Sequence, residues 1–127
     1  MSLLIAEHIR KKLSDNPKLT EVVGDRMYPC VVTSETEYPF IVYTRDECAP
    51  SDTKDGFVHD NVSESVYIFS DDYTESVNVA ELVRSSLANS TGDYDLFSVS
   101  ECIMTSASES FAEDAFAQVL TFNIITE

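Results

Sequence analysis

Residues 61–88 constrain the fold more than any other part of the sequence, because the spacing of their apolar residues changes partway along. From Asn61 to Ser70 apolar and polar residues alternate, which predicts a half-buried strand. Asp72 and Glu75 then form a D-x-x-E capping box, typical of a helix start. One helical face continues to about Ala88 through Tyr73, Val77, Ala80, Val83 and Leu87. A strand that leads directly into an amphipathic helix favours a sheet with a helix packed on it.

The rest of the chain supplies one more helix and four more strands. Ser2 is a candidate cap for a helix over residues 3–14, and one or two further helical turns are expected from Pro17 to Gly24. The expected strands are Met27 to Val32, Phe40 to Arg45, Leu96 to Ala107 and Phe116 to Thr126. The order is therefore α-β-β-β-α-β-β. We expect a single α+β domain over residues 1–127, with an antiparallel or mixed sheet and two helices packed on one face.

The sequence also indicates the form of two connections between strands. Glu47 to Phe57 is rich in acids, Ser, Pro and Gly, and this composition predicts a long loop or a flexible hairpin arm. The last two strands are expected to form a hairpin around Glu109 to Glu113.

The charge of the chain is strongly acidic and unevenly distributed. There are 23 acidic and 8 basic residues, for a net charge of -15. Five of the bases lie within residues 1–26, and no Lys or Arg follows Arg84. Such a surface repels the phosphate backbone, which argues against conventional nucleic-acid binding. Three explanations of the acidity remain: solubility, a basic protein partner, or a surface along which DNA slides freely.

No motif predicts an enzyme, a metal site or a cofactor. Nucleophilic catalysis needs a base close to the nucleophile, and neither His8 nor His59 lies in a recognisable motif with Cys30. The three cysteines are widely spaced without a C-x-x-C pair, and we expect them to be free, buried thiols. With three glycines in the chain, a phosphate-binding loop is not expected. No run of 18 apolar residues is present, so we expect no membrane span and a cytoplasmic protein.

An ordered set of short motifs resembles the small phage tail-completion family, which includes the tail terminators and tail-to-head joining proteins of long-tailed phages and prophages. The resemblance covers about residues 3–88. The matching motifs, in order, are Gly24-Asp25-Arg26, Tyr28-Pro29, Pro39-Phe40-Ile41-Val42-Tyr43, Asp55-Gly56, Asp72-Tyr73 and Leu82-Val83-Arg84-Ser85-Ser86-Leu87. The segment from Glu37 to Gly56 departs from the family pattern, because it is richer in acids than the corresponding partner-contact loop.

The resemblance implies a structural protein that forms a ring, usually six-fold, at the head-proximal end of the tail tube. Its partners would be further copies of itself, the tail-tube protein and the head connector, and DNA would pass through the lumen without being read. It would assemble in the cytoplasm and end in the virion tail. A lumen lined by carboxylates would give the acidity a mechanism, although the acids could equally face outward.

Head-to-tail contacts close a ring, and the arm from Cys48 to His59 and the sheet edge are the candidate contact surfaces. The candidate subunit or partner interface residues are Arg45, Asp52, Lys54, Asp55 and His59. Arg45 and Lys54 would each pair with an acid on the neighbouring subunit. The alternative function is an acidic DNA mimic that inhibits a DNA-binding protein, which would require carboxylates spaced like phosphates along one elongated face.

Overall fold

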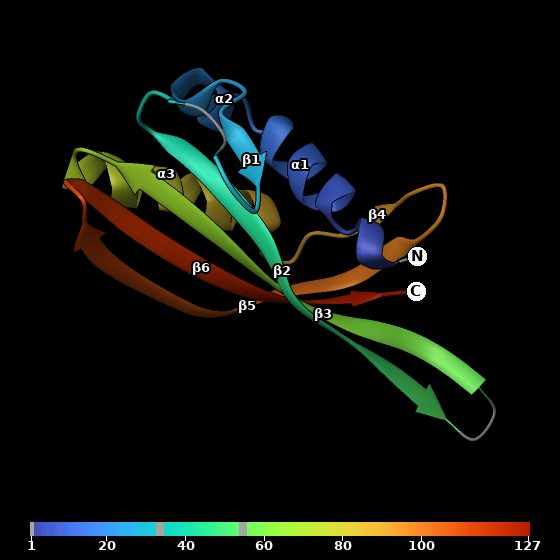
Figure 1. Ribbon diagram of the computed structural model, residues 1–127. Coiled ribbons are helices and arrows are strands. Elements are labelled where there is room, and N and C mark those ends of the chain that lie inside the picture. The colour runs from blue at the N-terminus through green and yellow to red at the C-terminus, as the bar shows by residue number, and fades with distance from the viewer. Residues whose placement is uncertain (1, 33–34, 54–55) are drawn as a thin grey trace.

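The computed structural model describes residues 2–32, 35–53 and 56–127, which form three α-helices, a 3-10 turn and six strands (Figure 1). The helical elements are η1 (Ser2–Leu4), α1 (Ala6–Ser14), α2 (Pro17–Val23) and α3 (Tyr73–Leu87). The strands are β1 (Met27–Pro29), β2 (Phe40–Thr53), β3 (Gly56–Ser70), β4 (Gly92–Asp93), β5 (Ser98–Ala112) and β6 (Ala115–Thr126). The expected order is retained, with α2 as a separate helix and the short β4 as an additional strand.

All six strands belong to one sheet, in the order β1-β2-β3-β6-β5-β4. β1 pairs parallel to β2, and the other neighbours are antiparallel, so the sheet is mixed. The α+β class is therefore confirmed. β3 and β6 lie at the centre of the sheet, which explains why their apolar residues alternate so regularly in the sequence.

The helices gather on one side of the sheet (Figure 1). α3 contacts β3 and β6 directly, while α1 and α2 pack against α3. Alternate residues of the central strands, such as Val66 and Ile68 of β3, are fully buried beneath them. The remaining large buried side chains of this core include Ile9, Leu13, Leu19, Ile41, Val83, Leu87, Phe122 and Ile124. Burying this apolar surface is the main stabilising contribution to the fold.

The start of α3 matches the capping box in part. The Asp72 carboxylate accepts a hydrogen bond from the Glu75 backbone N–H at 2.9 Å, as expected. The Glu75 carboxylate does not return the bond to Asp72 directly. It accepts instead from the Ser70 hydroxyl at 2.8 Å, and that hydroxyl oxygen accepts from the Asp72 backbone N–H at 3.1 Å. Ser70 is buried at the end of β3, so this relay fixes the angle between β3 and α3.

The expected cap at Ser2 is wrong. Ile5 occupies the N-cap position of α1 and makes no side-chain capping bond. The Ser2 side chain donates a hydrogen bond to the Asp60 carboxylate of β3, because residues 2–4 form a 3-10 turn that folds against the sheet. Asn16 caps α2, because its side-chain oxygen accepts hydrogen bonds from the backbone N–H groups of Lys18 and Leu19. Its side-chain amide also donates to the Ser86 hydroxyl of α3 at 2.8 Å.

The segment from Glu47 to Phe57 is a hairpin arm, and the long-loop alternative is wrong. β2 continues past Arg45 to Thr53, and its register with β3 runs to the Thr53–Gly56 pair, with irregularities at Arg45/Glu47 and Ser51/Asp52. Pro50 is tolerated because this part of β2 has no outer neighbour among the described residues, so the missing N–H interrupts no ladder. The arm projects beyond the rest of the sheet (Figure 1).

Two other strand boundaries differ from the expectation. β1 ends at Pro29, because Cys30 adopts a left-handed conformation with φ of 63°. β5 extends five residues past Ala107, and the hairpin turn consists of Glu113 and Asp114, whose φ values are 53° and 62°. Two residues with positive φ form the tight hairpin turn that matches the twist of the strands. Polar residues predicted an earlier turn, but both faces of this end of β5 are exposed, so a polar strand is stable there.

Candidate assembly interface

The hairpin arm brings several of the predicted interface residues onto one element. Arg45 lies at its base in β2 and is exposed, and His59 of β3 is half-buried and pairs with Ser51. The backbone of Asp52 pairs with Phe57. Lys54 and Asp55 fall outside the described residues. The arm is thus an extended surface that belongs to the sheet at one end and leaves the body of the protein at the other.

The N-terminal turn is fastened to the base of the arm. The Arg45 guanidinium donates a hydrogen bond to the Leu3 carbonyl oxygen at 2.9 Å, and the Ser2 hydroxyl bonds to the Asp60 carboxylate. Ser2 also lies 3.6 Å from the sulfur of Cys48. These contacts join residues that are more than 40 positions apart in the sequence, and they hold the N-terminal turn against the base of the arm. No local pattern in the sequence signals them.

Two long strand edges lie at opposite sides of the sheet. β1 covers β2 only from Ile41 to Tyr43, and β4 covers β5 only at Ser98 and Val99. Asn89 also donates its backbone N–H to the Cys102 carbonyl oxygen at 2.7 Å. Among the residues that the structure describes, no further strand pairs with the outer edges of Thr44–Thr53 or Ile103–Ala112. Each edge therefore presents backbone N–H and C=O groups that can accept another strand. Two different free edges on one molecule suit a head-to-tail contact between copies.

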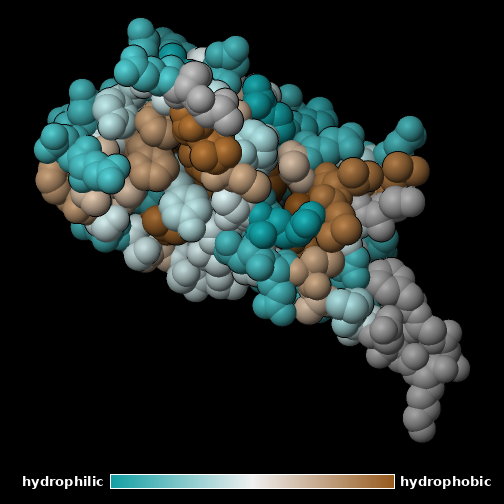
Figure 2. Space-filling model, in the orientation of Figure 1, coloured by the Kyte–Doolittle hydropathy of each residue, from teal (hydrophilic) through white to brown (hydrophobic). Residues whose placement is uncertain are grey.

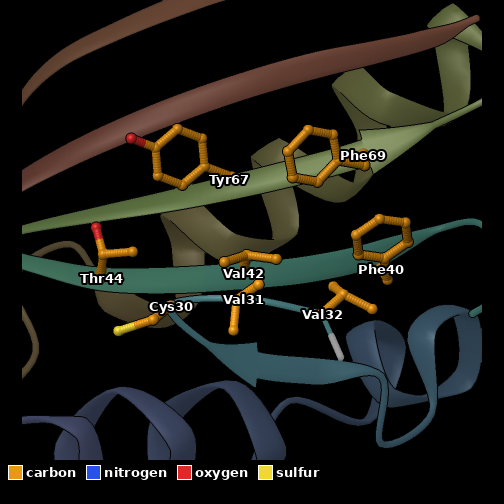
Figure 3. A pocket seen from close by; sticks show the side chains of 8 residues that line it. All are labelled: Cys30, Val31, Val32, Phe40, Val42, Thr44, Tyr67 and Phe69. Carbon is orange, nitrogen blue, oxygen red and sulfur yellow. The ribbon is translucent and has the colours of Figure 1, made fainter. Parts of the chain in front are cut away.

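The face of β2 and β3 that lies away from α3 is apolar and holds a hollow of about 400 Å³ (Figure 3). Phe40 and Val42 of β2 and Tyr67 and Phe69 of β3 line it, together with Thr44 and residues 30–32. The rings of Phe40 and Phe69 are stacked with centroids 5.1 Å apart. Val31 is 61% exposed at its margin. Figure 2 shows hydrophobic surface both over this part of the sheet and near the N-terminal end.

Cys30 is exposed, so the expectation of buried thiols is wrong for this residue and correct for Cys102. The left-handed turn at Cys30 redirects the chain after Pro29, and its backbone N–H donates to the Tyr43 carbonyl at 2.9 Å. Residues 31 and 32 then cross the apolar face. All three cysteines are free, and Cys48 is half-buried. Burial raises the pKa of the Cys102 thiol to about 11, which makes this thiol unreactive.

Two ionisable side chains, His8 and Glu64, are buried on the helix side of the sheet. Burial, with a smaller contribution from the Lys12 cation, lowers the pKa of His8 to about 4. Burial, followed by repulsion from Asp46, raises the pKa of Glu64 to about 7, and Arg45 opposes this shift. The charge of Glu64 argued against its burial, but the alternation in this strand places position 64 on the same face as Val62 and Val66.

The described residues contain no group of three or more His, Cys, Asp or Glu side chains placed to hold a metal ion. Within the same residues, no helix has the length and apolar character needed to cross a membrane.

The fold belongs to a class found in phage-like virions. One similar structure is a chain described as part of the "Virion of native gene transfer agent (GTA) particle", with a TM-score of 0.83 and 15% sequence identity. The match covers 94% of this chain and 91% of that chain. A family model for "Tail completion protein gp17" matches residues 7–127, and the protein therefore belongs to that tail-completion family. Among curated proteins, no sequence matches this chain.

Proposed function

We propose that this protein is a structural component of a phage or prophage tail that caps the head-proximal end of the tail tube and joins it to the head connector as a ring. The observation that carries the proposal is the tail-completion family match over residues 7–127. The fold shared with a chain of a gene transfer agent virion supports it. The protein is not an enzyme in this proposal, and it acts through the surfaces it offers to other subunits.

The two free strand edges supply a route to a ring. In a head-to-tail contact, the β2 edge of one copy pairs with the β5 edge of the next, and repetition closes the ring without leaving a free edge. The family resemblance favours six copies. The hairpin arm, with Arg45, Asp52, Lys54, Asp55 and His59, reaches beyond the body and contacts the neighbouring subunit or the connector.

The acidity of the chain fits passage of DNA through such a ring. A net charge of -15 per subunit repels phosphates, so DNA slides past without being bound. The acids of the described residues lie on several elements, including Asp72 at the start of α3, Glu101 in β5 and Asp114 in the β5–β6 turn. This spread over a helix cap, a strand and a turn disfavours the single phosphate-like row that a DNA mimic requires.

The proposal is tested by tail assembly in a prophage or phage that carries the gene. Deletion of the gene should leave heads and tails unjoined, or tubes of irregular length, as counted by electron microscopy, and the wild-type gene should restore joined particles. The purified protein, mixed with tail-tube protein, should give a ring by native mass spectrometry. Normal particles after deletion, or a monomer that binds neither tube protein nor connector, would refute the proposal.

An arm variant separates the role of the arm from that of the fold. Replacing Ser51–His59 with Asn-Gly shortens β2 and β3 but leaves the Ser2–Asp60 contact in place. We expect a folded protein that no longer restores joined particles. The matched control is Arg84→Gln on α3, which removes an exposed cation away from the arm and should restore them fully. Full activity of the shortened variant would show that the arm is not part of the interface.

A further inference from the structure

Glu64 forms the floor of a small pocket at the base of the arm. Its side chain is 1% exposed, and its Oε2 atom has no hydrogen-bond partner among the described residues. The pocket beside it has a volume of about 160 Å³. A buried carboxylate oxygen without a partner is costly, because it has lost its water and gained no donor. Such an oxygen can accept a hydrogen bond from a donor that enters the pocket.

The walls of the pocket divide into a buried floor and an exposed rim. Ile5 and Tyr43 are buried beside Glu64, whereas the rim consists of exposed residues from η1, α1, β2 and the end of β1. The rim residues are Leu3, Ala6, Pro29, Cys30 and Arg45. A side chain that enters from the surface would pass a rim that is apolar apart from Arg45 and the Cys30 thiol before it reached the carboxylate. This arrangement suits a group with an apolar stem and a charged end.

The charge around the pocket favours a cation. Repulsion from Asp46 adds to the effect of burial on Glu64 and raises its pKa, and the attraction to Arg45 only partly offsets this. The Arg45 guanidinium donates to the Leu3 carbonyl oxygen and makes no ion pair with Glu64. The Glu64 carboxylate is therefore attracted to the Arg45 cation but makes no ion pair with it.

We propose that this pocket receives the ammonium group of a lysine from a partner protein. A single free oxygen matches a compact ammonium better than the planar fork of a guanidinium, and a charge-assisted bond would form in a site shielded from water. A partner protein is a better source than a second copy, because this chain carries 23 acidic residues against 8 basic ones, a balance that complements a basic partner. Of its lysines in the described residues, Lys11 already forms an ion pair with Asp15.

The identity of the partner as a tail or head protein rests on the proposed function, but the chemistry of the pocket does not.

Lysine binding by the pocket is tested on the isolated protein. The probe is Nα-acetyl-lysine N-methylamide, and its binding is followed by NMR at pH 7.5 and low salt. We expect saturable shifts at Ile5, Ala6 and Cys30, with a dissociation constant on the order of millimolar. Nα-acetyl-norleucine N-methylamide, which keeps the stem and lacks the charge, should bind at least tenfold more weakly. The Glu64→Gln variant, which keeps the shape of the side chain, should show the same loss.

Three results would overturn the proposal: no saturable shift with the lysine probe, equal binding of the norleucine probe, or unchanged binding by Glu64→Gln. Binding that appears only in Arg45→Gln would show that Arg45 is the natural occupant, and it would also overturn the proposal. A thermal melt of each variant confirms that it is folded.

The source of the lysine is tested separately with a carbodiimide, which couples a carboxylate to an adjacent amine as an amide. The ¹⁵N-labelled protein is mixed with unlabelled tail-tube and connector proteins, and cross-linked peptides are read by mass spectrometry. A Glu64 cross-link to a lysine of the unlabelled partner supports the proposal. A cross-link only to a labelled lysine identifies a second copy and refutes the assignment to another protein. If the protein forms no ring but still binds the lysine probe, the proposed function is refuted. The proposal that the pocket binds lysine is then still supported.

Discussion

The imidazole of His8 and the hydroxyl of Tyr94 are joined by a hydrogen bond of 2.7 Å across 86 residues of sequence. The other ring nitrogen of His8, Nε2, lies 2.9 Å from the Ser90 hydroxyl oxygen. Because that hydroxyl donates its own proton to the Leu87 carbonyl, it accepts from His8, and Nε2 carries the imidazole proton. Nδ1 then accepts from Tyr94. His8 thus fastens α1 to the segment after α3 as a neutral base.

The neutral state of His8 makes part of the stability depend on pH. The pKa of His8 is lowered to about 4 in the folded protein, so the unfolded chain binds this proton first as pH falls from about 6.5. The stabilising contribution is present above pH 6.5 and is lost as pH falls through about 4, and it amounts to about 3 kcal/mol. His8→Gln should lose this contribution, so the wild type should gain stability relative to the variant as pH rises from 4 to 6.5. Urea unfolding of both proteins between pH 4 and 7 measures it, and parallel curves would contradict the assignment.

Glu64 should act in the opposite direction over a similar range. Its pKa is raised to about 7 in the folded protein, so its contribution is fully present below about pH 4.5 and is lost as pH rises through 7. Glu64→Gln should therefore become more stable relative to the wild type as pH rises from 4.5 to 8, by about 3 kcal/mol at most. Because His8 and Glu64 offset one another, the wild type should vary less than either variant. A stability difference that does not change with pH would show that Glu64 titrates normally.

Gly92 provides the space in which Tyr94 reaches His8. A Cβ atom at position 92 would lie 2.7 Å from the Tyr94 hydroxyl oxygen and 2.9 Å from the ring. Tyr94 cannot move freely, because its ring is stacked on Phe97 with centroids 4.8 Å apart. Gly92→Ala should destabilise the protein by about 1 to 3 kcal/mol. In a Tyr94→Phe background, Gly92→Ala should lower the free energy of unfolding by a smaller amount. Thermal unfolding of the wild type, the two single variants and the double variant tests this coupling. Strict additivity would show that the clash is relieved elsewhere.

Cys30→Ser should leave both folding and tail assembly intact, since the Cys30 backbone rather than its sulfur makes the contact with Tyr43. Alkylation should modify the exposed Cys30 first and leave Cys102 unmodified in the folded protein, because Cys102 is buried and its pKa is raised. Particle counts and mass spectrometry of the alkylated protein measure the two effects. Loss of assembly with an unchanged melting temperature would show that the thiol has a role of its own.

The sequence alone predicted the elements whose signals are local. The D-x-x-E box located the start of α3, and the alternation in Asn61–Ser70 and Phe116–Thr126 located the two central strands. The resemblance to tail-completion proteins also came from short ordered motifs, and the family match confirmed it. The extent of the arm and of β5 could not be predicted, because polar strands are held by pairing with a neighbour and their composition is that of a loop.

Apolar periodicity and capping, which act within a few residues, determined the α+β class and most of the helix and strand positions. Only the tertiary structure decided which polar residues are buried and which edges are free. The Ser2–Asp60, His8–Tyr94 and Arg45–Leu3 contacts each join residues more than 40 positions apart. The alternation in β3 places Glu64 in register with Val62 and Val66, but its burial as a charged residue depends on the N-terminal turn, since Leu3 and Ile5 line the same pocket. Such long-range contacts depend on how all the elements pack together, so no local pattern encodes them.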